Sequence, residues 1–165
     1  MVHEKFIQNM SIEELINRYS RTIFRLAFSK TRNRSDAEDI TQDVFLKYMK
    51  SKPKFNDEEH RKAWLMKVTI NTSKTLLMSA WFRKTTMMEE ADDIVTELNE
   101  KSEVYYAVLK LPTKYRQIVH LFYYEDMSIE SISQITGMKT STIKSQLHRA
   151  RLMMKDSLKE DMDFV

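Results

Sequence analysis

Glycine is almost absent from this chain: Gly137 is the only one among 165 residues, and there are only two prolines. Glycine and proline are the residues that most often end helices and form tight turns. Because so few of them are present, the chain has few places at which a helix can break or reverse. The sequence therefore predicts an all-α fold.

Gly137 also stands at an informative place. A short amphipathic run, residues 128–136, stops at the glycine, and Thr140 can cap a second helix three residues later. Glycine readily takes the left-handed backbone conformation that ends a helix and turns the chain. A helix, a tight glycine turn and a basic helix are typical of a DNA-binding helix-turn-helix.

Length and composition limit the class of protein. The 165 residues leave room for one domain, or for two small ones of about 70–85 residues each. The absence of cysteine excludes disulfides and thiolate metal sites. No apolar run approaches the roughly 18–20 residues of a membrane span, and residues 1–5 lack the apolar core of a signal peptide. We therefore expect a soluble, cytoplasmic protein.

The net charge of +3 is unevenly distributed. Residues 1–85 carry 17 Lys and Arg against 10 Asp and Glu, residues 86–104 carry one against seven, and residues 105–165 carry nine against seven. A basic block, an acidic bridge and a mildly basic block predict two small helical domains and a linker. We place the domains at residues 1–85 and 102–165 and the acidic linker at residues 86–101.

The N-terminal block contains signals for helix starts. Ser11 with Glu14 and Ser35 with Glu38 both fit the Ser-x-x-Glu capping box. A third helix is expected from near Glu59 past Leu77, and shorter helices over residues 102–110 and after Pro112.

The helix after Gly137 has one apolar stripe, formed by Ile143, Leu147, Ala150 and Met154, which must pack on the preceding helix. From Gly137 to Lys155 there are five Lys and Arg and no acid. Lys and Arg neutralise phosphates and read guanine, whereas Ser and Thr add short hydrogen bonds. An ordinary solvated basic helix is the alternative. The residues expected to face DNA are Lys139, Thr140, Ser141, Thr142, Lys144, Ser145, His148, Arg149 and Arg151.

A second basic stretch runs from His60 to Met88, with six Lys and Arg and no acid. Trp64, Trp81 and Phe82 are interleaved with these charges. Cations that follow the backbone and rings that stack on unpaired bases are the means by which proteins bind single-stranded nucleic acid. The alternative for each tryptophan, taken singly, is a place in the core.

A third stretch carries acids at helical spacing: Asp36, Asp39 and Asp43 share one face, with Gln42 beside them and Phe45 at the edge. Paired acids can serve catalysis or bind a metal, but no His, Cys or glycine loop accompanies these. The remaining interpretations are a solvated face and a docking face for a basic partner, to which Phe45 adds apolar area.

These stretches, in this order, resemble an extracytoplasmic-function sigma factor, the smallest class of bacterial RNA polymerase sigma subunits. The resemblance covers nearly the whole chain. Residues 36–45 resemble the helix that binds core polymerase, and residues 63–71 resemble the helix that engages the −10 element. Residues 111–116 resemble the start of the C-terminal domain, and residues 142–151 resemble the helix that reads the −35 element.

The resemblance implies roles for individual residues. The residues after Gly137 would read the −35 promoter element, and Lys54–Asp57 would capture a flipped −10 base. The contacts implied with the β′ clamp helices of the polymerase are Asp36, Asp39, Gln42, Asp43 and Phe45. The contacts implied with the −10 element are Phe55, Asn56, Arg61, Lys62, Trp64, Lys67, Asn71, Lys74 and Arg83.

The resemblance also implies partners: the polymerase core, including its β flap, promoter DNA, and an anti-sigma factor that is membrane-bound. It implies no cofactor, metal, small-molecule substrate or catalytic residue. Two other functions stay open from the residues alone. One is a stand-alone helix-turn-helix regulator that dimerises through its N-terminal half, and the other is a helical protein-interaction module.

Overall fold

The computed structural model describes residues 6–81 and 103–163. These residues form helices and no strand, so the prediction of an all-α fold is confirmed. The order is α1 (Ile12–Thr31), α2 (Arg34–Ser51), α3 (Glu58–Trp81), α5 (Glu103–Lys110), α6 (Thr113–Val119), the π-helical turn η1 (His120–Tyr124), α7 (Ile129–Thr136) and α8 (Thr140–Asp163). The expected linker, residues 86–101, lies outside the described residues.

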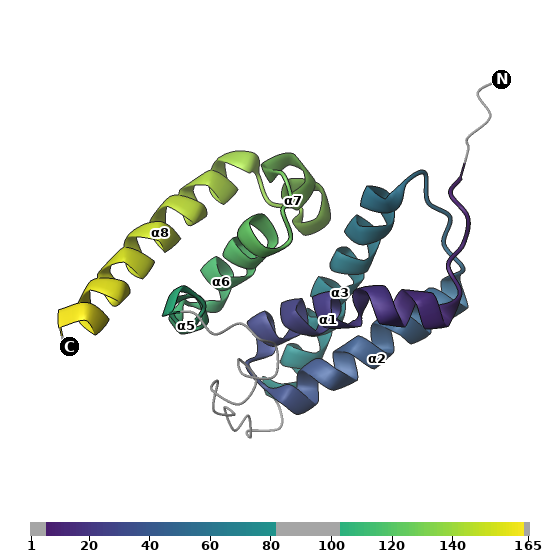
Figure 1. The fold of residues 1–165 in the computed structure, drawn as a ribbon, viewed down its shortest axis with the longest axis horizontal. Coiled ribbons are helices and arrows are strands. Elements are labelled where there is room, and N and C mark those ends of the chain that lie inside the picture. Colours follow the sequence, from purple (N-terminus) through teal and green to yellow (C-terminus); the bar gives the residue numbers. More distant parts are fainter. Residues whose placement is uncertain (1–5, 82–102, 164–165) are drawn as a thin grey trace.

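Helices α1, α2 and α3 pack against one another, and α8 packs against α5, α6 and α7 (Figure 1). The core of the first group is lined by residues at helical spacing on α1, such as Leu15, Ile23 and Leu26. An aromatic cluster of Tyr48, Phe55 and Trp64 belongs to the same core, with ring centroids 5.8–6.3 Å apart.

The start of α1 is confirmed, whereas the predicted start of the next helix is wrong. Ser11 caps α1, since its Oγ accepts a hydrogen bond from the Glu14 amide at 3.2 Å. Helix α2 is capped by Asn33, whose Oδ1 accepts from the Asp36 amide at 2.9 Å, and Ser35 lies inside the helix. Arg32 adopts the left-handed conformation with φ of 50°, so the chain has already turned and the next cap-forming residue, Asn33, begins α2.

The helix-turn-helix is formed by α7 and α8. Gly137 has a φ of 75° and its amide donates to the Ser133 carbonyl at 2.9 Å, which is the left-handed end of a helix that glycine favours. Ile132 and Ile143 are buried where the two helices pack together. The apolar stripe therefore faces inward, as the spacing predicts.

The two groups of helices also touch each other. Helix α1 contacts α6 and η1, and α3 contacts α7. In the described structure, the helix-turn-helix half is thus packed against the N-terminal half.

Candidate nucleic-acid interface

The first turns of α8 present a polar surface. The side chains of Ser141, Lys144, Ser145, His148 and Arg149 are exposed, as are those of the remaining residues that the sequence places on this face, Lys139, Thr140, Thr142 and Arg151. Because Ile143, Leu147 and Ala150 anchor the opposite side of the helix, these side chains lie on the face that can enter a DNA groove.

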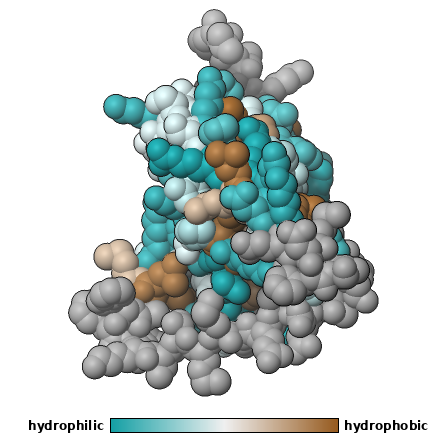
Figure 2. Space-filling view, turned by 90° about the vertical axis from the view of Figure 1, so that its left-hand side faces the viewer, coloured by the Kyte–Doolittle hydropathy of each residue, from teal (hydrophilic) through white to brown (hydrophobic). Residues whose placement is uncertain are grey.

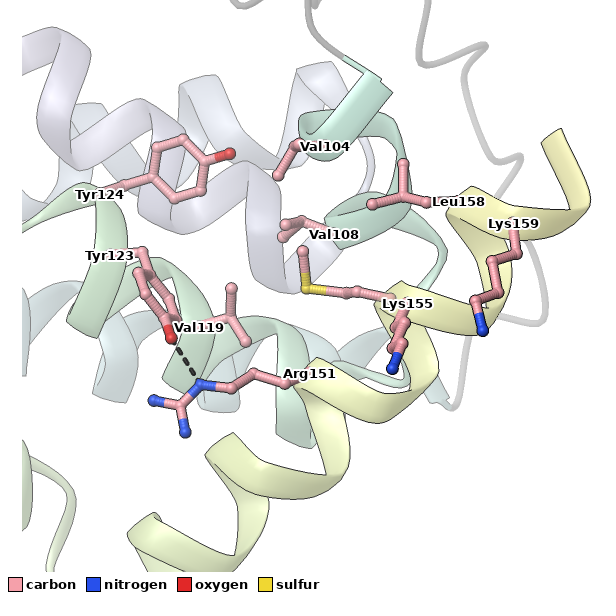
Figure 3. A pocket seen from close by; sticks show the side chains of 10 residues that line it. Val104, Val108, Val119, Tyr123, Tyr124, Arg151, Lys155, Leu158 and Lys159 are labelled. Atoms are coloured by element: carbon pink, nitrogen blue, oxygen red, sulfur yellow. Dashed lines mark hydrogen bonds between the residues drawn. The ribbon is translucent and has the colours of Figure 1, made fainter. Parts of the chain in front are cut away.

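Arg151 has a partner in the protein. Its Nε donates to the Tyr123 hydroxyl at 2.6 Å, and its guanidinium lies 5.7 Å from the centre of that ring. Both residues line a groove of about 470 Å³ between α5, η1 and α8 (Figure 3). Arg151 therefore belongs to the rim of this groove as well as to the basic helix.

The groove has an apolar interior and a basic rim. Val104 and Val108 of α5 and Leu158 of α8 line its interior, and Lys155 and Lys159 lie along α8 (Figure 3). Seen from the side on which α8 ends, apolar residues interrupt the polar surface (Figure 2). This is a surface suited to an apolar segment of another protein.

The outer face of α3 is the second polar surface. Lys67, Asn71 and Lys74 follow one another at spacings of four and three and are all exposed, so they form one stripe. Trp64 is half-buried, with its ring against Tyr48 and Phe55. Arg83 lies outside the described residues.

Two residues expected to contact the −10 element are buried. Phe55 and Arg61 are each 1% exposed, so the prediction that they contact DNA directly is wrong for this structure. The Phe55 ring packs against Trp64, and the Arg61 guanidinium lies 5.4 Å from the centre of the Phe55 ring. Residue type indicated a basic and aromatic surface here, but it could not say which of these side chains point inward.

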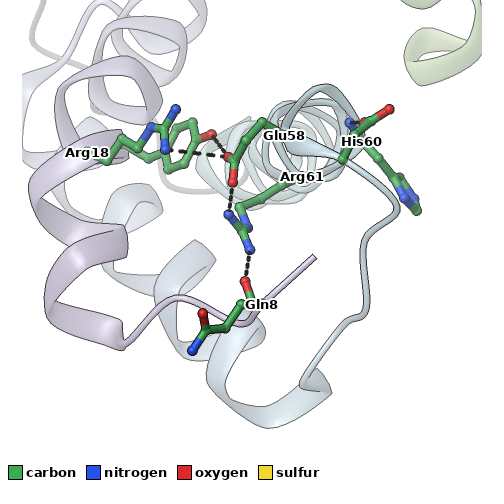
Figure 4. A network of polar contacts seen from close by, with 7 residues as sticks. Gln8, Arg18, Glu58, His60 and Arg61 are labelled. Atoms are coloured by element: carbon green, nitrogen blue, oxygen red, sulfur yellow. Dashed lines mark hydrogen bonds and ion pairs between the residues drawn. The ribbon is translucent and has the colours of Figure 1, made fainter. Parts of the chain in front are cut away.

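Arg61 belongs to a polar network at the start of α3 (Figure 4). Its Nη1 pairs with the Glu58 carboxylate and its Nη2 donates to the Gln8 carbonyl at 2.9 Å. The Tyr19 hydroxyl donates to Glu58 Oε2 at 2.8 Å. Burial, together with the adjacent Glu58 carboxylate, raises the pKa of Tyr19 to about 12, so this hydroxyl remains a hydrogen-bond donor at neutral pH.

The loop between α2 and α3 exposes Asn56 and Asp57. The Asp57 carboxylate accepts from the His60 amide at 2.7 Å, and the Asn56 amide donates to His60 Nδ1 at 3.2 Å. Asp57 therefore acts as a cap for α3.

Helix α2 carries the acidic face. Asp39 and Gln42 are exposed, Asp36 and Asp43 are half-buried, and Asp43 pairs with Lys47 at 3.1 Å. Phe45 is only 8% exposed, so the expectation that it adds apolar area to this face is wrong.

The apolar area on this face comes instead from Leu46 and Met49, each 50% exposed. Leu46 follows Asp43 by three residues and Met49 follows Gln42 by seven, which places them on the acidic face of the helix. Sequence reasoning missed both residues, although helical spacing measured from the acids would have found them.

Lys62 is held by the other half of the molecule. Its ammonium donates to the Glu125 carbonyl at 2.7 Å and pairs with the Glu125 carboxylate at 3.3 Å. Glu125 is 5% exposed, and its other carboxylate oxygen lies 3.3 Å from Nε2 of the buried His120. Lys62 thus joins α3 to the turn that precedes α7.

A second contact between the halves involves the end of α1. Arg116 is buried, and its guanidinium donates to the carbonyls of Ser29 and Lys30 as well as to those of Leu109 and Leu111. The Lys30 ammonium donates to Gln117 Oε1 at 2.5 Å. Burial lowers the pKa of Lys30 to about 8, and the charges of Lys74 and Arg116 add to this shift.

Within the described ranges, no group of three or more His, Cys, Asp or Glu is arranged to hold a metal ion. Over the same ranges, every helix is too short or too polar to span a membrane.

Two family descriptions match this chain. "Sigma-70 region 2" matches residues 15–83, and "Sigma-70, region 4" matches residues 101–154. The first range contains α1 to α3, and the second contains the helix-turn-helix.

Individual relatives match over most of the chain. The RNA polymerase sigma factor SigV of Bacillus subtilis is 32% identical over 156 residues, which cover 89% of this chain and 91% of SigV. The ECF RNA polymerase sigma factor SigE of Mycolicibacterium smegmatis is 27% identical, over 90% of this chain and 62% of SigE. SigW of Bacillus subtilis, also an ECF sigma factor, is 23% identical over 89% and 88% of the two chains.

Solved structures show the same fold. The sigma factor RpoE of Bartonella quintana, crystallised with the anti-sigma factor NepR, superposes with a TM-score of 0.72 at 20% identity, over 89% of this chain and 96% of RpoE. CnrH, in complex with the cytosolic domain of CnrY, gives a TM-score of 0.63 at 21% identity, over 91% and 88% of the two chains. With regions 2 and 4 matched and SigV aligned along nine tenths of both chains, this protein belongs to the extracytoplasmic-function group of the sigma-70 family of RNA polymerase sigma factors.

Proposed function

We propose that this sigma factor directs core RNA polymerase to its promoters through two DNA-reading surfaces, one on each half of the molecule. The observation that carries this assignment is the exposed polar face of α8, which is free of acidic side chains from Lys139 to Lys155. A second exposed stripe, Lys67, Asn71 and Lys74 on α3, belongs to the other half. Two separate sites on one chain fit the two separate elements of a promoter.

The −35 element is read by α8. Lys144 and Arg149 supply phosphate contacts and the bidentate donor that guanine accepts, and Ser141, Ser145 and His148 supply short hydrogen bonds. The buried stripe of Ile143 and Leu147 fixes the rotation of the helix, so this set of side chains is held toward the groove.

The −10 element is held by α3 and the preceding loop. Lys67, Asn71 and Lys74 follow the backbone at the upstream edge, and the exposed Asn56 and Asp57 receive a flipped base. Taking a base out of the stack costs a few kcal/mol, which contacts to its edge must recover.

The polymerase is bound by the acidic face of α2. Asp39, Gln42 and Asp43 contact the β′ clamp helices, and Leu46 and Met49 add the apolar area that a stable interface needs. The groove beside Arg151 is the candidate surface for the β flap.

An anti-sigma factor and a cytoplasmic location complete the proposal. RpoE and CnrH, which share this fold, are described in complexes with NepR and with the cytosolic domain of CnrY. A partner of which one domain is cytosolic supports the expected membrane-bound anti-sigma factor. As a transcription initiation factor, the chain positions polymerase and DNA and carries out no bond-making step of its own.

Reconstitution with bacterial core polymerase and a promoter library tests the function. Defined transcription start sites that depend on this protein, and that share −35 and −10 sequences, are the expected result. Binding to a palindromic operator in the absence of polymerase, with no specific transcription, would instead identify a stand-alone regulator. The absence of any salt-dependent DNA affinity would identify a protein-interaction module.

A further inference from the structure

We propose that the segment Phe6–Met10 is part of the −10 reading site, because it holds the loop of residues 52–57 in the position that base capture requires. This inference rests on the proposed role of that loop. The residues of the segment contact no DNA themselves in this proposal; they position Asn56 and Asp57.

Consecutive residues of the segment contact the loop and the helix after it. The Lys54 ammonium lies 5.6 Å from the centre of the Phe6 ring. The Ile7 amide donates to the Phe55 carbonyl at 2.8 Å. The Gln8 carbonyl accepts from Arg61 Nη2 at 2.9 Å (Figure 4). The segment therefore runs alongside the loop and is bonded to it through its main chain.

Hydrogen bonds hold the loop of residues 52–57 at its start, at its end and at Phe55 between them. At its start, Lys52 ends α2 in the left-handed conformation, and its amide donates to the Tyr48 carbonyl at 3.0 Å. At its end, Asp57 caps α3. Between these points, Phe55 is held through its buried ring and through the hydrogen bond that its carbonyl accepts from Ile7.

Arg61 explains why the segment stays in place. Burying a guanidinium is costly unless its charge is paired, and each N–H group that finds an acceptor lowers that cost. Glu58 supplies the counter-charge and the Gln8 carbonyl supplies a second acceptor. Loss of the segment would leave part of a buried charged group without a partner, which is costly.

The backbone position of Phe55 determines where the exposed Asn56 and Asp57 lie. Asn56 follows it directly, so a shift of the Phe55 backbone is passed on to Asn56 and Asp57. A pocket that recovers the cost of base flipping must hold its polar groups within about 0.5 Å. Without the Ile7 hydrogen bond, the loop should still form but should select bases less well.

The test is Ile7→Pro, which removes the amide donor, with Gln8→Ala as the matched control, because the side chain of Gln8 is exposed and only its carbonyl is used. Each variant is assembled with core polymerase, and binding is measured on promoters that carry each of the four bases at the flipped position. Ile7→Pro should lower the preference for the best base about tenfold, whereas Gln8→Ala should retain it. Affinity for the core polymerase and for the −35 element should be unchanged in both.

An unchanged base preference in Ile7→Pro overturns the inference. A loss of base preference that only accompanies a loss of core affinity and of thermal stability overturns it too, because the segment would then be merely structural. If Ile7→Pro does not fold, Phe6→Ala is the test variant. It removes the cation–π contact with Lys54, which is weaker than the hydrogen bond, so the base preference should fall about twofold to threefold. A wild-type holoenzyme without any base preference refutes the proposed −10 role itself.

Discussion

Substitutions at Gly137 test whether the helix-turn-helix needs glycine for its backbone conformation or for its small size. A Cβ atom built on Gly137 would meet no atom within 4 Å, yet the residue has a φ of 75°. The cost of a side chain is therefore conformational: an L-residue in the left-handed region costs about 1–2 kcal/mol. A β-branched residue costs more than alanine, and asparagine costs less, because its side chain tolerates this region.

The expected series of unfolding free energies follows directly. Gly137→Asn should lose less than about 1 kcal/mol, Gly137→Ala about 1 kcal/mol and Gly137→Val about 2 kcal/mol or more. Chemical denaturation gives the stability of each variant, and binding to a −35 duplex by the assembled holoenzyme gives the function. Affinity for the β′ clamp helices of the polymerase should stay constant across the series, because α2, which is proposed to bind them, is not involved.

The order of the three variants is the decisive result. Equal losses for Gly137→Asn and Gly137→Val would mean that the glycine is needed for space and not for its φ, which contradicts the open surroundings of its Cβ position. A loss of core binding that tracks the loss of −35 binding would mean that the two halves of the molecule do not act independently.

Three further predictions concern single side chains. Asp43→Lys should impair binding to core polymerase while the protein stays folded, and Glu13→Lys, a charge reversal at an exposed position on α1, is the control; equal core affinity of Asp43→Lys and the wild type would exclude this docking face. Arg149→Ala should weaken −35 binding by about 1–3 kcal/mol if it reads a base, as measured by titration of a promoter duplex, and unchanged affinity would remove it from the interface. Because burial lowers the pKa of Lys30 from 10.5 to about 8, the folded state disfavours its charged form. The free energy of unfolding should therefore rise between about pH 8 and pH 10.5 in the wild type relative to Lys30→Met, and parallel pH curves for the two proteins would refute this.

Local sequence signals were sufficient for the helices and for the helix-turn-helix. Gly137 indicated a turn because few other residues take a positive φ, and the stripe of Ile143 and Leu147 faces inward because helical spacing puts it on one side. The wrong cap at Ser35 shows where such signals fail. Asn33 and Ser35 both favour the start of a helix, and the choice depends on the left-handed turn at Arg32, for which no residue type gave a signal.

The surfaces were harder to predict, because burial depends on the partner of a side chain as much as on its type. Arg61 and Lys62 are adjacent and both basic, yet Arg61 is buried against Phe55 and Lys62 reaches Glu125. The partners of Arg61 include Gln8, which is 53 residues away in the chain. No periodicity links residues so far apart, so the pattern identified a basic region but could not assign its individual side chains.

The contacts between the two halves constrain how the protein engages a promoter. Lys62 is expected to contact the −10 element, but in this structure its ammonium is taken up by the carbonyl and carboxylate of Glu125. These two contacts use two of the three donors of the ammonium and set a carboxylate beside it, which repels a phosphate, so this ion pair weakens any contact of Lys62 with DNA. The other contacts named between the halves, Lys30 with Gln117 and Arg116 with the end of α1, are also polar. Water can replace these polar contacts at a smaller cost than it can solvate apolar surface, so they can give way when polymerase and DNA offer other partners.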